Sequence, residues 1–368
     1  MQKKKELKQE AVRGGRLEFL DSARGLAAWI VLLYHCIQYF NMNIMTLETR
    51  VIVPLKIVFN GTQAVSFFFV LSGFVLTASL RDLSGDFDYA NYLAKRVLRI
   101  YPLYLFAVWT AFFLTPAAGI FTLVQESIII LPHHNMLPPG WTMGVEVILS
   151  FLMPVVVIVQ RDRRMFYLLM GVVLLSYRYM NPFTFHFMLG AALYDAYRSG
   201  YRPAWLLRTG TLLVLVPVCL VLYSWREIAP VVPALMRKVN VILQFISMPE
   251  DTLTFYFSGL ASGVFIFLLL CADRVQRWLN HGFLTFIGKI SFSLYLLHWL
   301  FLEAVGYRDY GIRYVPHNMA GLAGLMIFIS AVTIAASYLS YRFIELPFMR
   351  LGKRVDLRHL LGARTKGI

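Results

Sequence analysis

Long apolar runs separated by short polar segments extend along nearly the whole chain. A helix needs about 20 apolar residues to cross the roughly 30 Å hydrocarbon core of a bilayer. The pattern predicts ten membrane-spanning helices, at 24–41, 58–80, 98–116, 141–160, 165–180, 182–197, 206–224, 253–272, 283–303 and 319–343. The fifth and sixth meet at Asn181-Pro182, which indicates an antiparallel helical hairpin. We therefore expect an all-α, polytopic transmembrane bundle of about ten spans.

One apolar segment, residues 117–131, is too short to be an eleventh span. It contains Gln125 and Glu126, and as a helix it would rise only about 22 Å. Counting it as a span would also move every later loop to the opposite side. We interpret it as an interfacial or re-entrant segment on the outer face.

The basic residues predict the orientation of the bundle. Of the 35 Lys and Arg residues, 27 fall on the side that holds both termini and 8 on the other. Because cytoplasmic loops are enriched in Lys and Arg, both termini are expected in the cytoplasm. A polar segment (1–15) then precedes the transmembrane domain (16–350), and a basic tail (351–368) follows it. The basic residues are spread over six inner segments, which argues against nucleic acid as a partner.

Composition agrees with a lipid environment. The chain is 58% hydrophobic and 15% charged, whereas soluble domains average about 45–50% and about 25%. Its mean hydropathy is +0.63. The three cysteines lie in apolar runs without C-x-x-C spacing, so we expect no metal site.

Ionisable residues inside a span are costly and are therefore candidates for function. In the first span, Asp21 and Arg24 are three residues apart and are expected to pair. His35 follows on the same helical face, about 16 Å further along the axis. Arg24 then lies at the inner boundary, where it could also be a topology anchor. His35 lies in the outer half, as a candidate general base or an interhelical hydrogen-bonding residue.

Two arginines mark the cytoplasmic entrance of the third span. Arg96 and Arg99 share one helical face. Two guanidinium groups in that position suit a phosphate or pyrophosphate. Positive-inside anchoring explains them equally well.

Polar residues recur every four positions in the fourth span. Thr142, Glu146 and Ser150 form one stripe, which is expected to face the bundle interior. Trp141, at the start of the span, is typical of an interfacial aromatic residue. Glu146 is the only acid deep within a predicted span, which favours a functional carboxylate over a structural one.

The ninth span has a similar pattern. Ser291, Tyr295 and His298 are spaced i, i+4, i+7 and share a face. His35, Glu146 and His298 are then expected at one outer depth, and the three arginines at the opposite, inner depth. Such an arrangement suits an anionic reactant held from the cytoplasm and proton-transfer groups that face outward.

These residues resemble the motifs of acyltransferase family 3, the bacterial multi-pass O-acyltransferases that modify surface sugars. The resemblance runs from about residue 16 to residue 350 and includes seven motifs in order. They are L-D-x-x-R-G-x-A at Leu20–Ala27, R-x(10)-H at Arg24 and His35, F-F-F-V-L-S-G-F at Phe67–Phe74, R-x-x-R at Arg96 and Arg99, W-x-x-x-V-E at Trp141–Glu146, S-x-Y-L-x-H at Ser293–His298 and Y-R-F-I-E-L-P at Tyr341–Pro347. Many relatives have V-E-E in the fifth motif, whereas Val147 follows Glu146 here, which weakens a two-carboxylate scheme.

The resemblance implies an enzyme of the bacterial inner membrane. Its donor would be cytoplasmic acyl-CoA, usually acetyl-CoA, and its acceptor a sugar or polysaccharide hydroxyl on the periplasmic face. The family ties Arg24, His35 and the Arg96–Arg99 pair to activity.

The expected roles follow from these positions. Arg96 and Arg99, helped by Arg24, would hold the coenzyme A phosphates, and His35 would be the base. Glu146 would orient His35 or stabilise its charged form. The supporting or substrate-contacting residues would be Asp21, Trp141, Tyr295 and His298. A transporter or flippase is the alternative, because it would use the same intramembrane polar groups.

Overall fold

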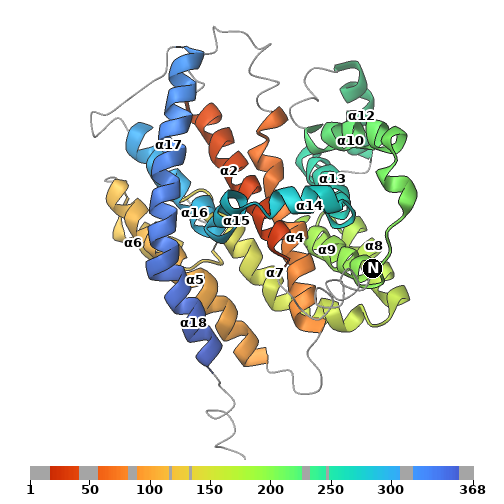
Figure 1. The fold of residues 1–368 in the computed structure, drawn as a ribbon, viewed down its shortest axis with the longest axis horizontal. Helices are drawn as coiled ribbons and strands as arrows, with labels where there is room; N and C mark the ends of the chain where they lie inside the picture. Colours follow the sequence, from red (N-terminus) through yellow and green to blue (C-terminus); the bar gives the residue numbers. More distant parts are fainter. Residues whose placement is uncertain are drawn as a thin grey trace, which may run out of the picture. The chain divides into compact units, whose positions relative to one another are not determined.

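The structure is a computed structural model that describes residues 17–40, 57–81, 89–115, 118–131, 135–225, 233–245, 248–306 and 318–355. The predicted polar segment 1–15, and the predicted tail beyond residue 355, lie outside the described residues. All regular elements in the described ranges are helical, as the sequence predicts (Figure 1).

The helices, in chain order, are α2 (Glu18–Phe40), α4 (Gly61–Arg81), α5 (Tyr89–Leu114), α6 (Ile120–Ser127), α7 (Gly140–Val159), α8 (Arg163–Leu175), α9 (Phe183–Arg198), the 3₁₀ turn η2 (Ala204–Leu207), α10 (Thr209–Tyr223), α12 (Pro233–Phe245), α13 (Glu250–Cys271), α14 (Asp273–Leu279), α15 (Gly282–Lys289), α16 (Ser291–Gly306), α17 (Met319–Ser340), the π-helical turn η5 (Tyr341–Glu345) and α18 (Leu346–Arg354).

Six helical segments of the described chain are long and apolar enough to cross a bilayer: α2, α4, α5, α7, α13 and the run α17–η5–α18. Counting α15 and α16 as one broken span gives seven. The predicted spans at 165–180, 182–197 and 206–224 correspond to α8, α9 and α10, which have 13, 16 and 15 residues. The polytopic helical class is therefore supported, whereas the count of ten and the orientation of the termini stay predictions.

The segment predicted to be interfacial contains α6, which has only eight residues. A helix of that length rises about 12 Å, well short of a bilayer core. Its length agrees with the interfacial interpretation of residues 117–131.

The chain divides into two compact units. The first comprises residues 1–34, 45–82 and 152–288, and the second comprises 35–44, 83–151 and 289–368. Each is described by itself below.

The first unit is organised around α4, α9 and α13, each of which packs against the other two. Gly73 and Gly190 allow α4 and α9 to approach closely: a Cβ on Gly73 would lie 2.1 Å from the carbonyl oxygen of Phe187, and one on Gly190 would lie 2.0 Å from that of Val70. Small residues at helix contacts are the main device for packing in lipid, where apolar surfaces gain nothing by leaving water. α8 also packs against α9, as the predicted hairpin requires.

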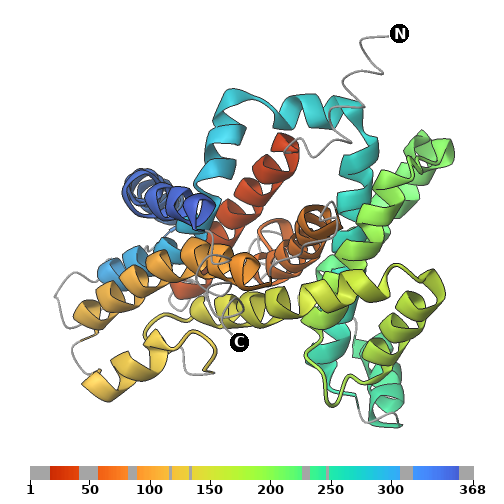
Figure 2. The same cartoon turned by 90° about the horizontal axis from the view of Figure 1, so that it is seen from below.

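The second unit is organised around α5, which packs against α6, α16 and α18 (Figure 2). Its apolar core includes Leu103 and Ala107 of α5, Leu123 of α6, Val147 of α7 and Leu296 of α16. Two tyrosines of α5 that pack in this core bond to backbone carbonyl oxygens of α6. Tyr101 donates to Ser127 and Tyr104 to Glu126, both at 2.6 Å. These bonds tie α6 to α5.

The close contact between α4 and α9 can be tested with Gly190→Ala. The added methyl group would meet the backbone of Val70, so we expect the free energy of unfolding to fall by about 3 kcal/mol. Gly171→Ala in α8 is the matched control, because no atom lies within 4 Å of its new Cβ. The control should be neutral or stabilising by up to about 1 kcal/mol. Thermal unfolding in detergent measures both, and equal transition temperatures would contradict the packing described for α4 and α9.

Candidate active site

Two predicted site histidines lie against each other in the second unit. The ring centroids of His35 (α2) and His298 (α16) are 5.2 Å apart, and the rings are inclined by 27°. The indole of Trp299 meets His35 edge-on, with the centroids 5.4 Å apart. The contact joins residues more than 260 positions apart in the chain. The spacing along each helix predicts a common depth for the two rings, but it does not predict that they touch.

The hydrogen bonds of His298 define which of its nitrogens is basic. Its Nδ1 lies 2.5 Å from the backbone carbonyl oxygen of Tyr295. A carbonyl oxygen only accepts, so Nδ1 is assigned the proton. The Nε2 atom of this fully buried residue has no hydrogen-bond partner among the described residues. His298 thus presents an unused lone pair beside the ring of His35.

A polar contact connects α16 with the stripe predicted on α7. The hydroxyl oxygens of Tyr295 and Thr142 are 3.0 Å apart, and both side chains are buried. The Tyr295 ring lies 5.9 Å from the ring of His298. The first residue of the stripe, Thr142, therefore lies next to the residues that surround the two histidines.

The far end of the same stripe meets α5, the helix of the two arginines. Tyr92 donates to the backbone carbonyl oxygen of Ser150 at 2.8 Å. The guanidinium carbon of Arg96 lies 5.8 Å from the centroid of the Tyr92 ring. Arg96 and Glu146 both lie within electrostatic range of the Tyr92 hydroxyl. Glu146 therefore lies one turn from Thr142 on one side and within electrostatic range of Tyr92 on the other.

Other predicted site residues have less enclosed positions. Glu146 and Arg99 are partly exposed. Trp141 is 37% exposed in the first turn of α7, which suits an interfacial aromatic residue.

The predicted ion pair at the start of α2 is present in the first unit. An Arg24 Nη2 atom lies 3.0 Å from Oδ1 of Asp21. The same nitrogen donates to the carbonyl oxygen of Gly288 at 3.4 Å. The helix passes very close to Gly288, because a Cβ on Gly25 would lie 2.6 Å from the Gly288 nitrogen. Arg24 is thus held by both a carboxylate and a carbonyl.

A carboxylate that the spacing did not single out is among the most buried of the described residues. Glu126 is fully buried, and its two oxygens accept the backbone N–H groups of Met136 and Leu137 at 2.7 and 3.2 Å. Charge-assisted bonds to backbone donors are strong, so Glu126 fixes the segment that leads into α7. Glu345 of η5 is also buried, and it accepts a hydrogen bond from Ser293 of α16.

A group of buried polar residues also occupies the first unit. The hydroxyl oxygens of Ser66 (α4) and Ser258 (α13) are 2.7 Å apart, and Gln63 is fully buried one turn before Ser66. His186 of α9 is fully buried too, and a Cβ on Gly259 would lie 2.6 Å from its Nε2 atom. In the sequence, these residues are isolated polar positions in otherwise apolar helices. Their spacing along each helix does not predict that they lie close together.

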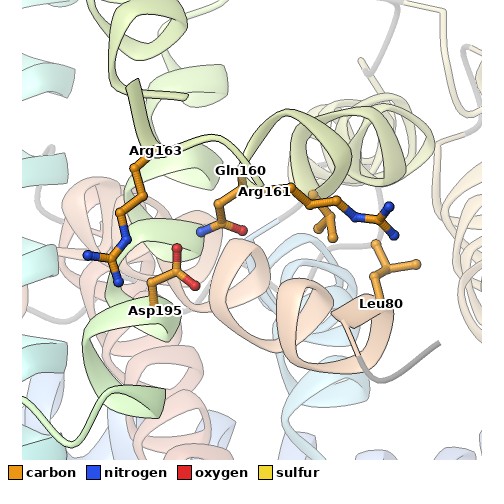
Figure 3. A pocket seen from close by; sticks show the side chains of 6 residues that line it. Leu80, Gln160, Arg161, Arg163 and Asp195 are labelled. Carbon is orange, nitrogen blue, oxygen red and sulfur yellow. The ribbon is translucent and has the colours of Figure 1, made fainter. Parts of the chain in front are cut away.

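A polar cavity of about 320 Å³ lies in the first unit, where α4, α7 and α9 end and α8 begins. Figure 3 shows Gln160, Arg163 and Asp195 pointing toward one space, with Arg161 and Leu80 beside it. Gln160 is buried and donates to the carbonyl oxygen of Ala191 at 2.7 Å. Arg161 and Arg163 both line this cavity, so they offer a comparison with Arg96 and Arg99.

Comparison with known proteins identifies the class of the chain. The model of acyltransferase family 3, described as an acyltransferase domain, matches residues 17–342. A protein of Acidianus two-tailed virus named "Putative acetyltransferase ORF330" is 25% identical over 328 residues, which cover 83% of this chain and 89% of that protein. No solved structure matches the chain. The chain belongs to acyltransferase family 3, and its apolar helices make it a multi-pass membrane acyltransferase.

The structural role of Glu126 can be tested with Glu126→Gln. The amide of glutamine keeps one oxygen that can accept a hydrogen bond. Its NH₂ group replaces the other oxygen and faces a backbone N–H, so two donors meet. We therefore expect the free energy of unfolding to fall by about 2 kcal/mol. Glu250→Gln removes an exposed carboxylate from the first turn of α13 and should change it by less than about 1 kcal/mol. Unfolding curves in detergent that shift equally for both variants would contradict the role of Glu126.

Proposed function

We propose that this protein is an O-acyltransferase of the bacterial inner membrane, which moves an acyl group, most simply acetyl, from cytoplasmic acyl-CoA to a sugar hydroxyl on the outer face. The observation that carries the proposal is the pair of stacked imidazoles of His35 and His298. Membership of acyltransferase family 3 supports the reaction class, and the positive-inside bias supports the two-sided arrangement.

The histidine pair suits the proton transfer that this reaction needs. A sugar hydroxyl has a pKa far above neutral, so it requires a base as its oxygen attacks the thioester carbonyl. His35 takes that proton in the proposed scheme. The carbon–sulfur bond then breaks, the proton passes to the departing thiolate, and the products are the sugar ester and free coenzyme A.

His298 and Glu146 are assigned supporting roles. The lone pair on His298 Nε2 can accept a hydrogen bond from the acceptor hydroxyl or from His35 and so orient it. Glu146 stabilises the imidazolium electrostatically while His35 holds the proton, as an acid does in a catalytic triad. Trp141 and Tyr295 are proposed to line the acceptor path.

Donor binding is assigned to the arginines. The phosphates of coenzyme A are anionic, and guanidinium groups bind phosphate through paired hydrogen bonds. In the second unit, Arg96 and Arg99 precede the part of α5 that enters the apolar core. Arg96 contacts Tyr92, which bonds to the backbone of Ser150 on α7. Glu146 lies one turn before Ser150 and one turn after Thr142, which meets Tyr295. Arg24, oriented by Asp21, is assigned a further phosphate contact.

A transporter or flippase is the second candidate function, and the buried polar group of Gln63, Ser66, His186 and Ser258 is the observation that favours it. Such groups mark substrate paths in membrane proteins. Purified protein incubated with radiolabelled acetyl-CoA distinguishes the two functions. An acyltransferase binds or hydrolyses this donor, whereas a flippase leaves it intact.

We expect His35→Ala to abolish acyl transfer while the protein still inserts in the membrane. The reason is the loss of the proposed base, which typically contributes about 10²–10⁴-fold to a rate. The assay measures labelled acyl groups in envelope glycans. His281→Ala is the matched control, because His281 is exposed and should transfer at the parent rate. Near-normal turnover by His35→Ala would refute the assignment.

We expect the double substitution Arg96→Gln and Arg99→Gln to raise the KM for acetyl-CoA at least about tenfold, because each charge-assisted hydrogen bond contributes about 1.5–3 kcal/mol. Arg161→Gln with Arg163→Gln removes the same charge from the polar cavity of the first unit. This control should leave the KM within about twofold of the parent value. The donor site would instead lie at the polar cavity if the control variant showed the larger rise.

A further inference from the structure

An apolar cavity of about 520 Å³ lies within the second unit, on the helix that carries His298. All its lining residues belong to α5, α16, α17 and η5: Phe106, Thr110, Leu114, Leu297, Leu300, Phe301, Ala304, Ala336, Leu339, Ser340, Phe343 and Ile344. We call this cavity the apolar groove. It is larger than the polar cavity of the first unit and has no charged lining residue.

The packing of the helices explains why the groove exists. α16 packs against both α5 and α17, and η5 and α18 return to α5. Small side chains, Ala304 and Ala336, stand where α16 and α17 face the groove. On α5, the lining residues Phe106, Thr110 and Leu114 recur every four positions, so the groove follows one helical face for about 12 Å.

The lining offers few polar groups: Thr110 and Ser340 are its two hydroxyl residues, and no lining residue carries a charge. Thr110, one of its two hydroxyl residues, donates to the carbonyl oxygen of Phe106 on its own helix at 2.8 Å. The other ten lining residues are hydrocarbon throughout. Phe106, Leu339 and Phe343 are 47%, 54% and 68% exposed, and they belong to candidate membrane-spanning segments. Apolar side chains left exposed on membrane-spanning helices face hydrocarbon, so a flexible alkyl chain is the occupant that matches the lining of the groove.

The groove lies beside the candidate active site on the same helix. Leu297 lines it and directly precedes His298, and Leu300 and Phe301 follow. His298 and Tyr295 occupy the neighbouring face of α16, toward His35 and Thr142. η5, which lines the end of the groove, is π-helical. Single π-turns within long helices are frequent at functional sites.

We propose that the apolar groove binds the hydrocarbon tail of the acyl acceptor, so that the acceptor is a lipid-linked sugar. The inference rests on the proposed acyltransferase function and adds the class of acceptor. A tail held against Leu297, Leu300 and Phe301 restricts the attached sugar to the neighbourhood of His298. The bilayer then delivers the acceptor, and the groove selects it by its tail.

The test uses alkyl β-glucosides from methyl to dodecyl and a hexadecyl glucoside with a diazirine in its tail, applied to the full-length protein in vesicles. Cross-linked peptides are mapped by mass spectrometry. In the parent protein we expect the diazirine probe to label α5, α16 and α17. We expect the alkyl glucosides to displace the probe more strongly as their alkyl chain lengthens. Ala336→Phe and, independently, Ala304→Phe should weaken displacement by dodecyl glucoside about tenfold, the loss expected when about two methylene groups lose their packing.

Ala335→Phe is the matched control, because it adds the same ring to the adjoining exposed position of α17, outside the groove, and should behave as the parent does. Acetyl-CoA hydrolysis without acceptor should be unchanged in all three variants. The proposal would be overturned if short and long glucosides displaced the probe equally, or if neither groove variant changed the labelling. Ordinary bilayer lipid would then be the occupant of the groove. The binding assay does not depend on turnover, so a parent protein without acetyl-CoA activity would contradict the proposed function and leave the groove result standing.

Discussion

A polar side chain in the hydrocarbon core of a bilayer must find its partner within the protein, and this constraint explains the architecture of the second unit. The partners come from different helices. Tyr92 of α5 bonds to the backbone of α7, Thr142 of α7 meets Tyr295 of α16, and Tyr104 of α5 bonds to the backbone of α6. Each bond that satisfies a polar group therefore also sets the distance between two helices. The side chains around the histidine pair belong to this same set of bonds.

Close packing of the helices also determines how they are arranged. In lipid, helices associate through close contact rather than through the removal of apolar surface from water. Gly73 and Gly190 bring α4 and α9 together until backbone meets backbone. Ala304 and Ala336 have the opposite effect, because their small side chains line the apolar groove and leave its space unfilled. Small residues thus allow close helix contact in the first unit and line an open groove in the second.

Local spacing was a good guide to which residues share a helical face. Asp21 and Arg24 pair as expected, and Thr142 and Ser150 of the predicted stripe are both buried. Spacing was a poorer guide to helix length, because α8 and α10 are shorter than the spans predicted at 165–180 and 206–224. It also missed Glu126, whose partners lie in a loop about ten residues further along the chain. The carboxylate indicated that the segment does not span the membrane. It did not indicate which groups would donate hydrogen bonds to it.

The sequence by itself determined the properties that follow from composition and helical period. These are an all-helical membrane chain, the family to which its motifs belong, and the faces that carry Arg24, Thr142 and His298. Only the tertiary structure decided which of these faces meet. The stacking of His35 on His298, the contact between Thr142 and Tyr295, and the groove beside Leu297 each join helices distant in the chain. The 3.6-residue period orders side chains around one helix, but the choice of neighbouring helix depends on side-chain shape and on which buried polar groups remain to be satisfied.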